Sequence, residues 1–263
     1  MPTLILSPRY TTDSIALAKA AAGLGWSVQR LLNWHAPDGL SADAFALYGE
    51  PFFAAALAEQ LSLHLLEPPF DWLATLPVSY SKRRVSATTL GEARLVTGAM
   101  FIKPADDKCF PAQVYSSGVE LRDTEHLPAE TPVLVSEPVE WEVEYRGFIR
   151  HNELQTLSPY FRDGNLAQTE DGDWPAAEEE VQEARDFYTR FLSDSEVKLP
   201  PGVVVDIGKI RGHGWAVVEA NPAWSSGIYG CDPSRVLPVV ESACVRADSV
   251  PDAHLQWIIS RTG

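Results

Sequence analysis

Short apolar segments alternate with amphipathic ones over the first 75 residues of the chain. The apolar run Leu4-Ile5-Leu6 predicts a buried strand, and Thr11-Thr12-Asp13 supplies N-cap side chains for a helix that follows it. The whole pattern predicts strands over residues 4–6, 27–32 and 63–66 and helices over residues 14–24 and 51–60. Strands that alternate with helices through short loops predict a small parallel sheet. We therefore predict an N-terminal α/β unit over residues 1–75.

The pattern changes beyond Pro68-Pro69 and Pro77, which mark a boundary near residue 75. Several later segments show the alternating polarity of strands with one buried face. The predicted strands cover residues 99–104, 133–135, 142–150, 153–157, 203–210 and 215–220, and the predicted helices cover residues 88–96, 176–192 and 234–245. These elements predict a second, larger region over residues 76–263 that contains two α+β lobes.

The chain of 263 residues carries a formal net charge of −15, and its only short basic run is Lys82-Arg83-Arg84. Because neutralisation of phosphates dominates binding to nucleic acid, this charge disfavours nucleic acid as a partner. No apolar stretch reaches the roughly 20 residues of a membrane helix, so no membrane partner is expected. Three cysteines without a CxxC pair and an N-terminus without a signal-peptide pattern predict a cytoplasmic protein. The sequence gives no indication of an oligomeric state.

Two apolar runs on either side of Arg211-Gly212-His213-Gly214 predict a hairpin. A two-residue type II′ turn at Gly212-His213 would place Asp206 opposite Glu219, with Asn221 further along the same face. Two carboxylates and an amide oxygen form a ligand set that suits Mg²⁺. Because facing carboxylates repel each other without a cation, we favour a metal site over a solvent-exposed polar face. For the same reason, we expect Glu219→Gln to leave the metal-free protein as stable as the parent or slightly more stable.

A second polar face follows the predicted strand over residues 142–150, where it contains Glu142, Glu144, Arg146 and Arg150. Arg146 could form a simple ion pair with Glu144, or that carboxylate could hold it in place as a phosphate clamp, and the sequence leaves both open. Lys103 ends an apolar strand, where a lysine is usually solvated. Residues 133–139 run from an apolar strand into an open segment whose backbone groups are free to bind a flat ligand.

These pieces, in this order along nearly the whole chain, resemble the ATP-grasp superfamily. The most specific part is Val218-Glu219-Ala220-Asn221-Pro222 followed by Gly227, which looks like the metal-binding signature of that superfamily. The segments Phe101-Ile102-Lys103-Pro104 and Glu144-Tyr145-Arg146-Gly147-Phe148 are similar to its compact clade named for two arginines and a lysine. The resemblance implies an α/β fold in which two α+β lobes hold a nucleotide between them. It also implies a small Rossmann-like unit at the N-terminus.

The resemblance implies a role for each matching residue. Arg146 and Lys103 would be catalytic, with Lys103 on the α- and β-phosphates of ATP and Arg146 on the γ-phosphate or acyl phosphate. The nucleotide site would consist of Lys103, Lys108, Glu137, Val139 and Glu144, with Glu137 and the backbone of Val139 at the adenine edge. Mg²⁺ would be held by Asp206, Glu219 and Asn221, and the acceptor side would contain Ser225, Ser226 and Tyr229. The resemblance also places one residue of the basic run near the nucleotide, and the sequence leaves open whether this is Lys82, Arg83 or Arg84. Residues 106–118 depart from the family, because they contain only Gly118 where many members have a glycine-rich flap.

The implied activity is that of an ATP- and Mg²⁺-dependent ligase that joins a small carboxylate to an amine or peptide acceptor through an acyl phosphate. The alternative is a nucleotide-binding regulatory or interaction protein without ligase turnover. A nucleotidyltransferase that adenylates a lysine is disfavoured, because neither Lys103-Pro104-Ala105 nor Lys108-Cys109-Phe110 has the pattern Lys-x-Asp-Gly. The sequence specifies neither the acid nor the amine.

Overall fold

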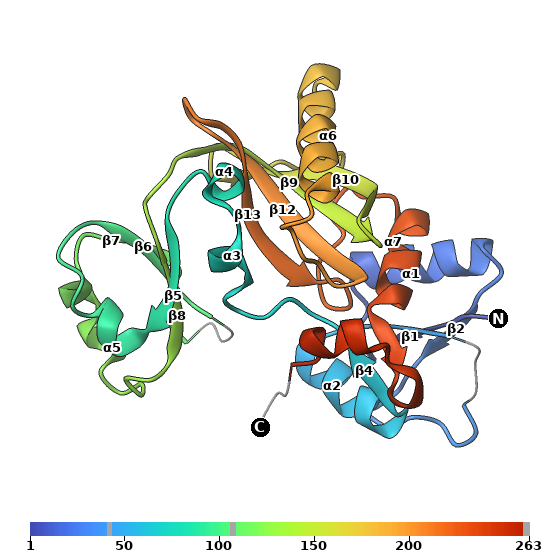
Figure 1. The fold of residues 1–263 in the computed structure, drawn as a ribbon. Coiled ribbons are helices and arrows are strands. Elements are labelled where there is room, and N and C mark those ends of the chain that lie inside the picture. Colours follow the sequence, from blue (N-terminus) through green and yellow to red (C-terminus); the bar gives the residue numbers. More distant parts are fainter. Residues whose placement is uncertain (41–43, 106–108, 260–263) are drawn as a thin grey trace.

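The structure is a computed structural model that describes residues 1–40, 44–105 and 109–259. It contains a parallel N-terminal sheet, a small four-stranded sheet and a larger five-stranded sheet. Figure 1 shows the four-stranded sheet on one side, the five-stranded sheet at the centre and the N-terminal unit on the other side. This mixed α/β architecture confirms the predicted fold class. None of the described helices is long and apolar enough to cross a membrane.

The N-terminal unit has a three-stranded parallel sheet in the order β2-β1-β3. Its elements are β1 (Thr3–Leu6), α1 (Thr12–Gly23), β2 (Ser27–Arg30), β3 (Phe45–Tyr48) and α2 (Pro51–Gln60). The third strand is β3, so the prediction of residues 63–66 for this place was wrong. Those residues contain β4 (Leu63–Leu65), which pairs antiparallel with β14 (Cys244–Arg246). All four residues of β3 are buried, and so short an apolar run carries little signal of its own.

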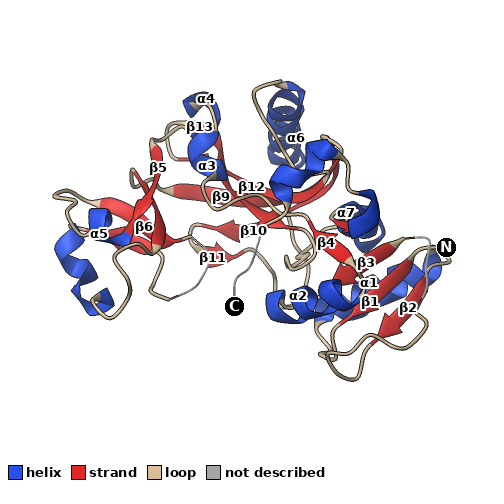
Figure 2. Ribbon diagram, turned by 60° about the horizontal axis from the view of Figure 1, so that its bottom comes forward, coloured by secondary structure: helices blue, strands red, loops and turns tan. Residues whose placement is uncertain are grey.

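The C-terminal part of the chain returns to the N-terminal unit. Helix α7 (Pro233–Ser242) packs against α1 and β3, and Figure 2 shows α7 close to α1. Val236 and Leu237 of α7 lie in the same buried cluster as Leu4 and Leu17. The N-terminal core is therefore completed by residues from the far end of the chain. After β14, the short helices η2 (Ala247–Ser249) and η3 (Asp252–Trp257) lead to the end of the described chain.

The four-stranded sheet is antiparallel, in the order β5-β8-β6-β7. Its strands are β5 (Val85–Thr89), β6 (Met100–Pro104), β7 (Gln113–Tyr115) and β8 (Pro132–Ser136), and the short helices α5 (Leu90–Ala93) and η1 (Gly118–Thr124) accompany them. Two further short helices, α3 (Trp72–Thr75) and α4 (Val78–Ser81), connect this sheet to the N-terminal unit. The predicted helix over residues 88–96 shrinks to the single turn of α5. Extension of β5 into Thr88 and Thr89 explains the difference, because β-branched residues favour strands.

The five-stranded sheet is antiparallel and has the order β11-β10-β9-β12-β13. Its strands are β9 (Trp141–Arg150), β10 (Glu153–Arg162), β11 (Asn165–Leu166), β12 (Gly202–Ile210) and β13 (Gly214–Pro222). The amphipathic helix α6 (Glu178–Ser193) covers one face and buries Phe187, Tyr188 and Phe191 there. The Tyr188 hydroxyl donates to the carbonyl oxygen of Val205 at 2.6 Å. Glu144, Arg146 and Asp206 alternate along their strands with residues of this buried cluster and therefore lie on the face that points away from α6.

The loop between β12 and β13 differs from the predicted turn. Ile210 pairs with Gly214, so the loop contains three residues, Arg211-Gly212-His213, and the prediction of a two-residue turn was wrong. Gly212 and Gly214 have φ angles of 76° and 78°, a region that favours glycine.

A β-bulge then corrects the register of the same hairpin. Ile207 pairs with Val217, whereas Asp206 pairs with Glu219, so Val218 is an extra residue in β13. The three-residue loop and the bulge offset each other. The predicted pairing of Asp206 with Glu219 is therefore confirmed, although a three-residue loop and a bulge produce it instead of a two-residue turn.

Candidate active site

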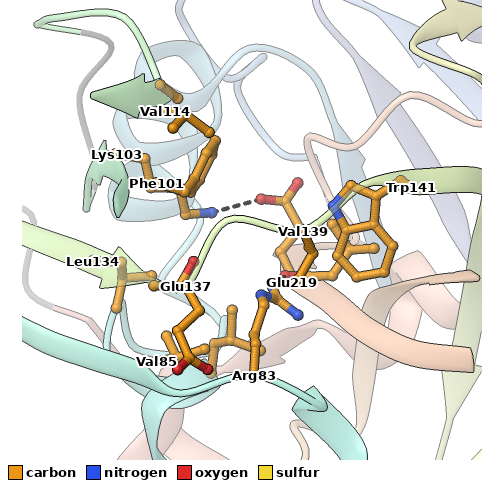
Figure 3. Close-up of a pocket in the computed structure, with 14 residues that line it drawn as sticks. Arg83, Val85, Phe101, Lys103, Val114, Leu134, Glu137, Val139, Trp141 and Glu219 are labelled. Carbon is orange, nitrogen blue, oxygen red and sulfur yellow. Dashed lines mark hydrogen bonds and ion pairs between the residues drawn. The ribbon is translucent and has the colours of Figure 1, made fainter. Parts of the chain in front are cut away.

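A cavity of about 380 Å³ lies between the four-stranded sheet and β13 (Figure 3). Apolar side chains form much of its wall, among them Phe101, Val114, Leu134 and Trp141. The other lining residues are Leu73, Arg83, Val85, Lys103, Ala112, Ser136, Glu137, Val139, Val218 and Glu219. An apolar cavity with a few charged groups suits a flat ring that carries a charged tail.

The charged end of this cavity contains an ion pair between Lys103 of β6 and Glu219 of β13. Lys103 Nζ lies 2.7 Å from Glu219 Oε2, and the dashed line in Figure 3 marks this contact. Burial would raise the pKa of Glu219, but the charge of Lys103 and the hydrogen bonds from Lys103 and Asn221 lower it to about 2. Glu219 is therefore ionised at neutral pH, and its ion pair with Lys103 links the five-stranded sheet to the four-stranded sheet.

Arg146 of β9 and Asp206 of β12 form a second, more deeply buried pair. The two residues are register partners on neighbouring strands. Arg146 Nε and Nη2 donate to the two oxygens of Asp206 at 2.9 and 2.7 Å, and the Asp206 side chain is 0 % exposed. Burial raises the pKa of Asp206, and the positive charge of Arg146 opposes that shift. Of the two open interpretations of Arg146, a pair with Glu144 does not form, because Asp206 takes that place.

Arg146 is also fixed on its faces and at its far end. Its guanidinium carbon lies 4.8 Å from the ring centre of Tyr229 and 5.3 Å from that of Tyr160. Its Nη1 donates to the carbonyl oxygen of Gly227 at 3.0 Å. These contacts use three of the five N–H donors of an arginine. The others keep a defined direction, which is what recognition of a phosphoryl group requires.

Glu144 lies on the same strand as Arg146 but has a different partner. Its carboxylate accepts a hydrogen bond from the Tyr160 hydroxyl at 2.7 Å. Burial raises the pKa of Glu144, the hydrogen bond from Tyr160 opposes this, and the charges of Asp206 and Glu219 add to the increase. The structure therefore gathers three carboxylates on this face of the sheet.

The predicted ligand set for Mg²⁺ comes together on this face. Asn221 Nδ2 donates to Glu219 Oε1 at 2.9 Å and to Asp206 Oδ2 at 3.3 Å. Among the described residues no three His, Cys, Asp or Glu side chains form a group that could hold a metal ion. Mg²⁺ is commonly held by one or two carboxylates, with phosphate oxygens and water as the remaining ligands. Two carboxylates and an amide thus fit a Mg²⁺ ion that arrives with a nucleotide. Lys103 and Arg146 meanwhile supply the cations that relieve the repulsion between the facing carboxylates.

The two arginines of the basic run point in different directions. Arg83 is 7 % exposed, lines the cavity and lies 5.0 Å from the ring centre of Trp141. Burial lowers the pKa of Arg83 to about 10 against the opposing charges of Glu144 and Glu219. Arg84 instead lies at the surface, where its Nη2 is 2.9 Å from Glu137 Oε1. Of the two arginines, Arg83 is therefore the one that lines the cavity.

The other predicted nucleotide residues divide into two cases. Glu137 and Val139 line the cavity, on the segment that leaves β8. Lys108 lies outside the described residues.

The predicted acceptor residues follow β13 and adjoin the N-terminal unit. A hollow of about 210 Å³ shares Lys103 and Glu219 with the larger cavity and is lined by Asn221 and Ser225 as well. The Tyr48 hydroxyl donates to the carbonyl oxygen of Ser226 at 3.0 Å. Tyr229 stacks on the ring of Tyr160 with a centroid distance of 5.1 Å. Ser225, Ser226 and Tyr229 are thus brought close to Arg146 and Asn221.

The sequence analysis did not identify the residues that hold the segment after β13 in place. Asp13 Oδ2 accepts a hydrogen bond from the backbone N–H of Ile228 at 3.0 Å. Thr11 is the N-cap of α1 and forms a capping box with Ser14, which leaves Asp13 available for this long-range contact. The pattern Thr-Thr-Asp does not indicate which of its residues caps the helix. Contacts between positions so far apart in the chain leave no signal in a single sequence.

Comparison with solved structures identifies the fold. A RimK domain protein of the ATP-grasp type from Sphaerobacter thermophilus matches with a TM-score of 0.54 and 15 % identity, covering 94 % of this chain and 98 % of that chain. D-alanine–D-alanine ligase from Bacillus anthracis matches with a TM-score of 0.55 and 10 % identity, covering 92 % and 97 %. D-cycloserine synthetase DcsG matches with a TM-score of 0.51 and 12 % identity, covering 91 % and 98 %. No curated protein matches the chain by sequence.

Comparison with models of protein families assigns the chain to one family within this fold. Residues 80–239, more than half of the chain, match an ATP-grasp domain family, the second family of the clade named for two arginines and a lysine. The match includes Lys103, Arg146, Asp206, Glu219 and Asn221, so it contains both ion pairs of the site. It agrees with the family and clade that the sequence motifs resembled. The chain belongs to the ATP-grasp family, in the second family of that clade.

Proposed function

We propose that this protein is an ATP- and Mg²⁺-dependent ligase that joins a carboxylate to an amine through an acyl phosphate. One observation carries the proposal: an apolar cavity reaches Glu219, the first of three charged residues that lie in a row, side by side on adjacent strands. These residues pair across the strands: Glu219 of β13 with Asp206 of β12, and Asp206 with Arg146 of β9. Lys103, on β6 of the four-stranded sheet, forms an ion pair with Glu219. The apolar part of the cavity suits the ring of ATP, and the charged residues suit its phosphates and their metal ion.

Each end of the nucleotide has candidate partners in the cavity. The adenine ring would lie among the apolar residues, with Glu137 and the backbone of Val139 at its edge. Lys103 would contact the α- and β-phosphates, and Lys108 would add a further basic contact. Glu144 would complete this nucleotide site. The support is that Glu137, Val139 and Lys103 all line one cavity.

The metal would be held by Asp206, Glu219 and Asn221, and the support is that the Asn221 amide lies within hydrogen-bond distance of both carboxylates. When bound, Mg²⁺ would neutralise charge on the phosphate oxygens. Lys103 leaves Glu219 for the phosphates in this proposal, so the ion pair of the nucleotide-free protein becomes two separate contacts with the nucleotide and its metal.

The reaction transfers a phosphoryl group and then an acyl group. A carboxylate oxygen attacks the γ-phosphorus of ATP, the bond from that phosphorus to the β–γ bridging oxygen breaks, and ADP leaves. The amine nitrogen then attacks the carbonyl carbon of the acyl phosphate, the carbon–oxygen bond to phosphate breaks, and the nitrogen loses a proton. Arg146 would hold the transferred phosphoryl group in both steps, because Asp206 and the two tyrosine rings fix its direction. Such transfers depend on positioning and charge stabilisation, which this set of side chains supplies.

The substrates would enter from the side of the N-terminal unit. Ser225, Ser226 and Tyr229 lie there beside Arg146, and the small hollow at Ser225 joins the nucleotide cavity through Lys103 and Glu219.

We propose a division into an N-terminal pre-ATP-grasp unit over residues 1–75 and a catalytic ATP-grasp domain over residues 76–263. A small carboxylate and an amine or peptide acceptor are the proposed partners, and neither nucleic acid nor a membrane is required.

A cytoplasmic location accords with this chemistry. Cys109, Cys231 and Cys244 are all free thiols, and burial raises the pKa values of Cys231 and Cys244 to about 12, which makes them inert.

The other candidate function is a nucleotide-binding protein without turnover. The intact pairs of Lys103 with Glu219 and of Arg146 with Asp206 favour the enzyme, because a binding protein has no need of a fixed arginine beyond the phosphates.

Thermal unfolding in the presence of nucleotide tests the proposal. ADP or ATP with Mg²⁺ should raise the melting temperature, because a ligand that binds only the folded state stabilises it by mass action. EDTA should abolish most of this increase, and Glu219→Gln should reduce it. If no nucleotide at millimolar concentration shifts the melting temperature of the parent protein, the proposal is wrong.

A further inference from the structure

The bulge at Val218 decides which way Glu219 points. Beyond the hairpin loop, the paired positions of β12 and β13 run from Ile210–Gly214 to Ile207–Val217. If this register continued without the bulge, Glu219 would pair with Val205. Val205 belongs to the buried cluster under α6, on the opposite face of the sheet. A slip of one residue moves a side chain to the other face, so the extra residue turns Glu219 toward the cavity.

Arg83 is bound to this bulge. Its Nη1 donates to the carbonyl oxygen of Val217 at 2.8 Å, and its Nη2 donates to the carbonyl oxygen of Val218 at 3.2 Å. A bulge disrupts the ladder locally and leaves backbone groups in need of other partners. The two carbonyl groups that Arg83 satisfies belong to the bulged residue and the residue before it. They are the two residues before Glu219 in the chain.

Arg83 is itself held in place from two further directions. Its Nη1 also donates to the carbonyl oxygen of Ser81 at 3.0 Å, and its guanidinium lies over the ring of Trp141. Lys82 adopts a left-handed conformation with φ 51°, which turns the chain at the end of α4 so that Arg83 points inward. Three backbone carbonyls thus take three N–H donors of a side chain that is 7 % exposed. This is the arrangement of an internal brace, since few donors remain for a ligand.

We propose that Arg83 is a positioning residue: it stabilises the bulge at Val218 and thereby aims the carboxylate of Glu219 into the cavity. The consequence for metal binding rests on the proposed function, in which Glu219 is a ligand of Mg²⁺. The role of Arg83 at the bulge does not rest on it. A simple contact between Arg83 and a nucleotide phosphate is the competing explanation, because Arg83 also lines the cavity.

Hydrogen–deuterium exchange of the nucleotide-free protein tests the brace directly. Arg83→Met should raise amide exchange in β13 by about tenfold, with the rest of the five-stranded sheet unchanged, because exchange reports local opening. Arg83→Lys should restore part of the protection, since its ammonium group can still donate to one or two of the carbonyls. Arg84→Met is the matched control and should leave exchange in β13 at the parental rate. If Arg83→Met fails to fold, Arg83→Lys against Arg84→Met gives the same comparison. Parental exchange in β13 of the Arg83 variants would overturn the proposal.

The Mg²⁺ dependence of ADP binding separates a brace from a phosphate contact. In Arg83→Lys, a brace predicts that the Mg²⁺ concentration for half-maximal ADP-induced stabilisation rises severalfold, while ADP binding in EDTA stays close to that of the parent. A phosphate contact predicts weaker ADP binding in EDTA and an unchanged requirement for Mg²⁺, and that result would overturn the proposal. If the parent protein shows no effect of Mg²⁺, the proposed function fails, and the exchange experiment still decides the role of Arg83.

Discussion

Asp206 holds Arg146 through both oxygens of its carboxylate, at 2.9 Å from Nε and 2.7 Å from Nη2. The pair lies inside the five-stranded sheet, with Asp206 fully buried and the Arg146 side chain 8 % exposed. Asn221 adds a third contact to Asp206. Asp206 therefore has two tasks in the proposed enzyme, because it aims the arginine and belongs to the metal site.

Asp206→Asn should destabilise the protein by about 3 kcal/mol, because it leaves the buried positive charge of Arg146 without its partner. Urea denaturation at neutral pH measures this loss. The matched control is the double variant Asp206→Asn with Arg146→Met, which removes the unpaired charge and should recover part of the stability. A double variant that is less stable than the single one would contradict this account of the pair.

Arg146→Lys should lower kcat by about 100-fold and change the affinity for ATP much less. Lysine keeps the charge, but it lacks the planar fork that binds Asp206 and a phosphoryl group at the same time. The loss should fall on kcat because the phosphoryl group changes most in the transition state. Steady-state kinetics gives kcat, and thermal shift with Mg-ADP gives the nucleotide affinity. An equal loss in both measurements would show that Arg146 serves nucleotide binding in general.

The ion pair of Lys103 with Glu219 changes the expectation for Glu219→Gln. The facing carboxylates alone predict repulsion, whereas in the structure Lys103 Nζ lies 2.7 Å from Glu219 Oε2. The pKa of Glu219 falls from an ordinary 4.5 to about 2 in the folded protein, so its contribution to stability is complete above pH 4.5 and disappears as the pH falls toward 2. We expect Glu219→Gln to cost about 1–2 kcal/mol at pH 7, allowing for the exposure of the pair to solvent.

Urea denaturation of both proteins between neutral and acidic pH checks this prediction. The difference in unfolding free energy between parent and variant should shrink as the pH falls below 4.5, the ordinary pKa of a glutamate. Glu137→Gln is a suitable comparison, because Glu137 pairs with Arg84 in a more exposed position and its loss should cost less at neutral pH. A variant as stable as the parent at neutral pH would favour the repulsion argument instead.

The sequence predicted which side chains come together at this site better than it predicted the backbone that positions them. Asp206, Glu219 and Asn221 converge as expected, yet the hairpin loop has one residue more than predicted and the bulge compensates for it. Neither feature could be read from the apolar pattern, because valine and alanine fit both registers. The carbonyl groups at the bulge accept hydrogen bonds from Arg83, which comes from a distant part of the chain.

The N-terminal unit also contains a feature that the local sequence pattern could not predict. Alternation of strands and helices predicted its parallel sheet, but the third strand, Phe45–Tyr48, is only four residues long. Its place beside β1 depends on burial against α7, at the other end of the chain. Tertiary contacts of this kind override short local patterns.

The products of ATP turnover give the most direct test of the reaction. An acyl-phosphate mechanism releases ADP and phosphate, whereas adenylation of the carboxylate releases AMP and pyrophosphate. We expect ADP and phosphate, because Arg146 is fixed two strands away from the ion pair of Lys103 with Glu219, toward the proposed γ-phosphate end of the row.

Chromatography of nucleotides after incubation with Mg-ATP and a pool of amino acids and short peptides distinguishes the two routes. Hydroxylamine should trap an acyl phosphate as a hydroxamate, and the yield should depend on the added carboxylates. Arg146→Lys should reduce hydroxamate and ADP together, since both arise from the same phosphoryl transfer. AMP and pyrophosphate would instead assign the protein to an adenylating mechanism. ADP formed equally with and without a carboxylate would indicate a kinase or an ATPase, because no carboxylate would then accept the phosphoryl group.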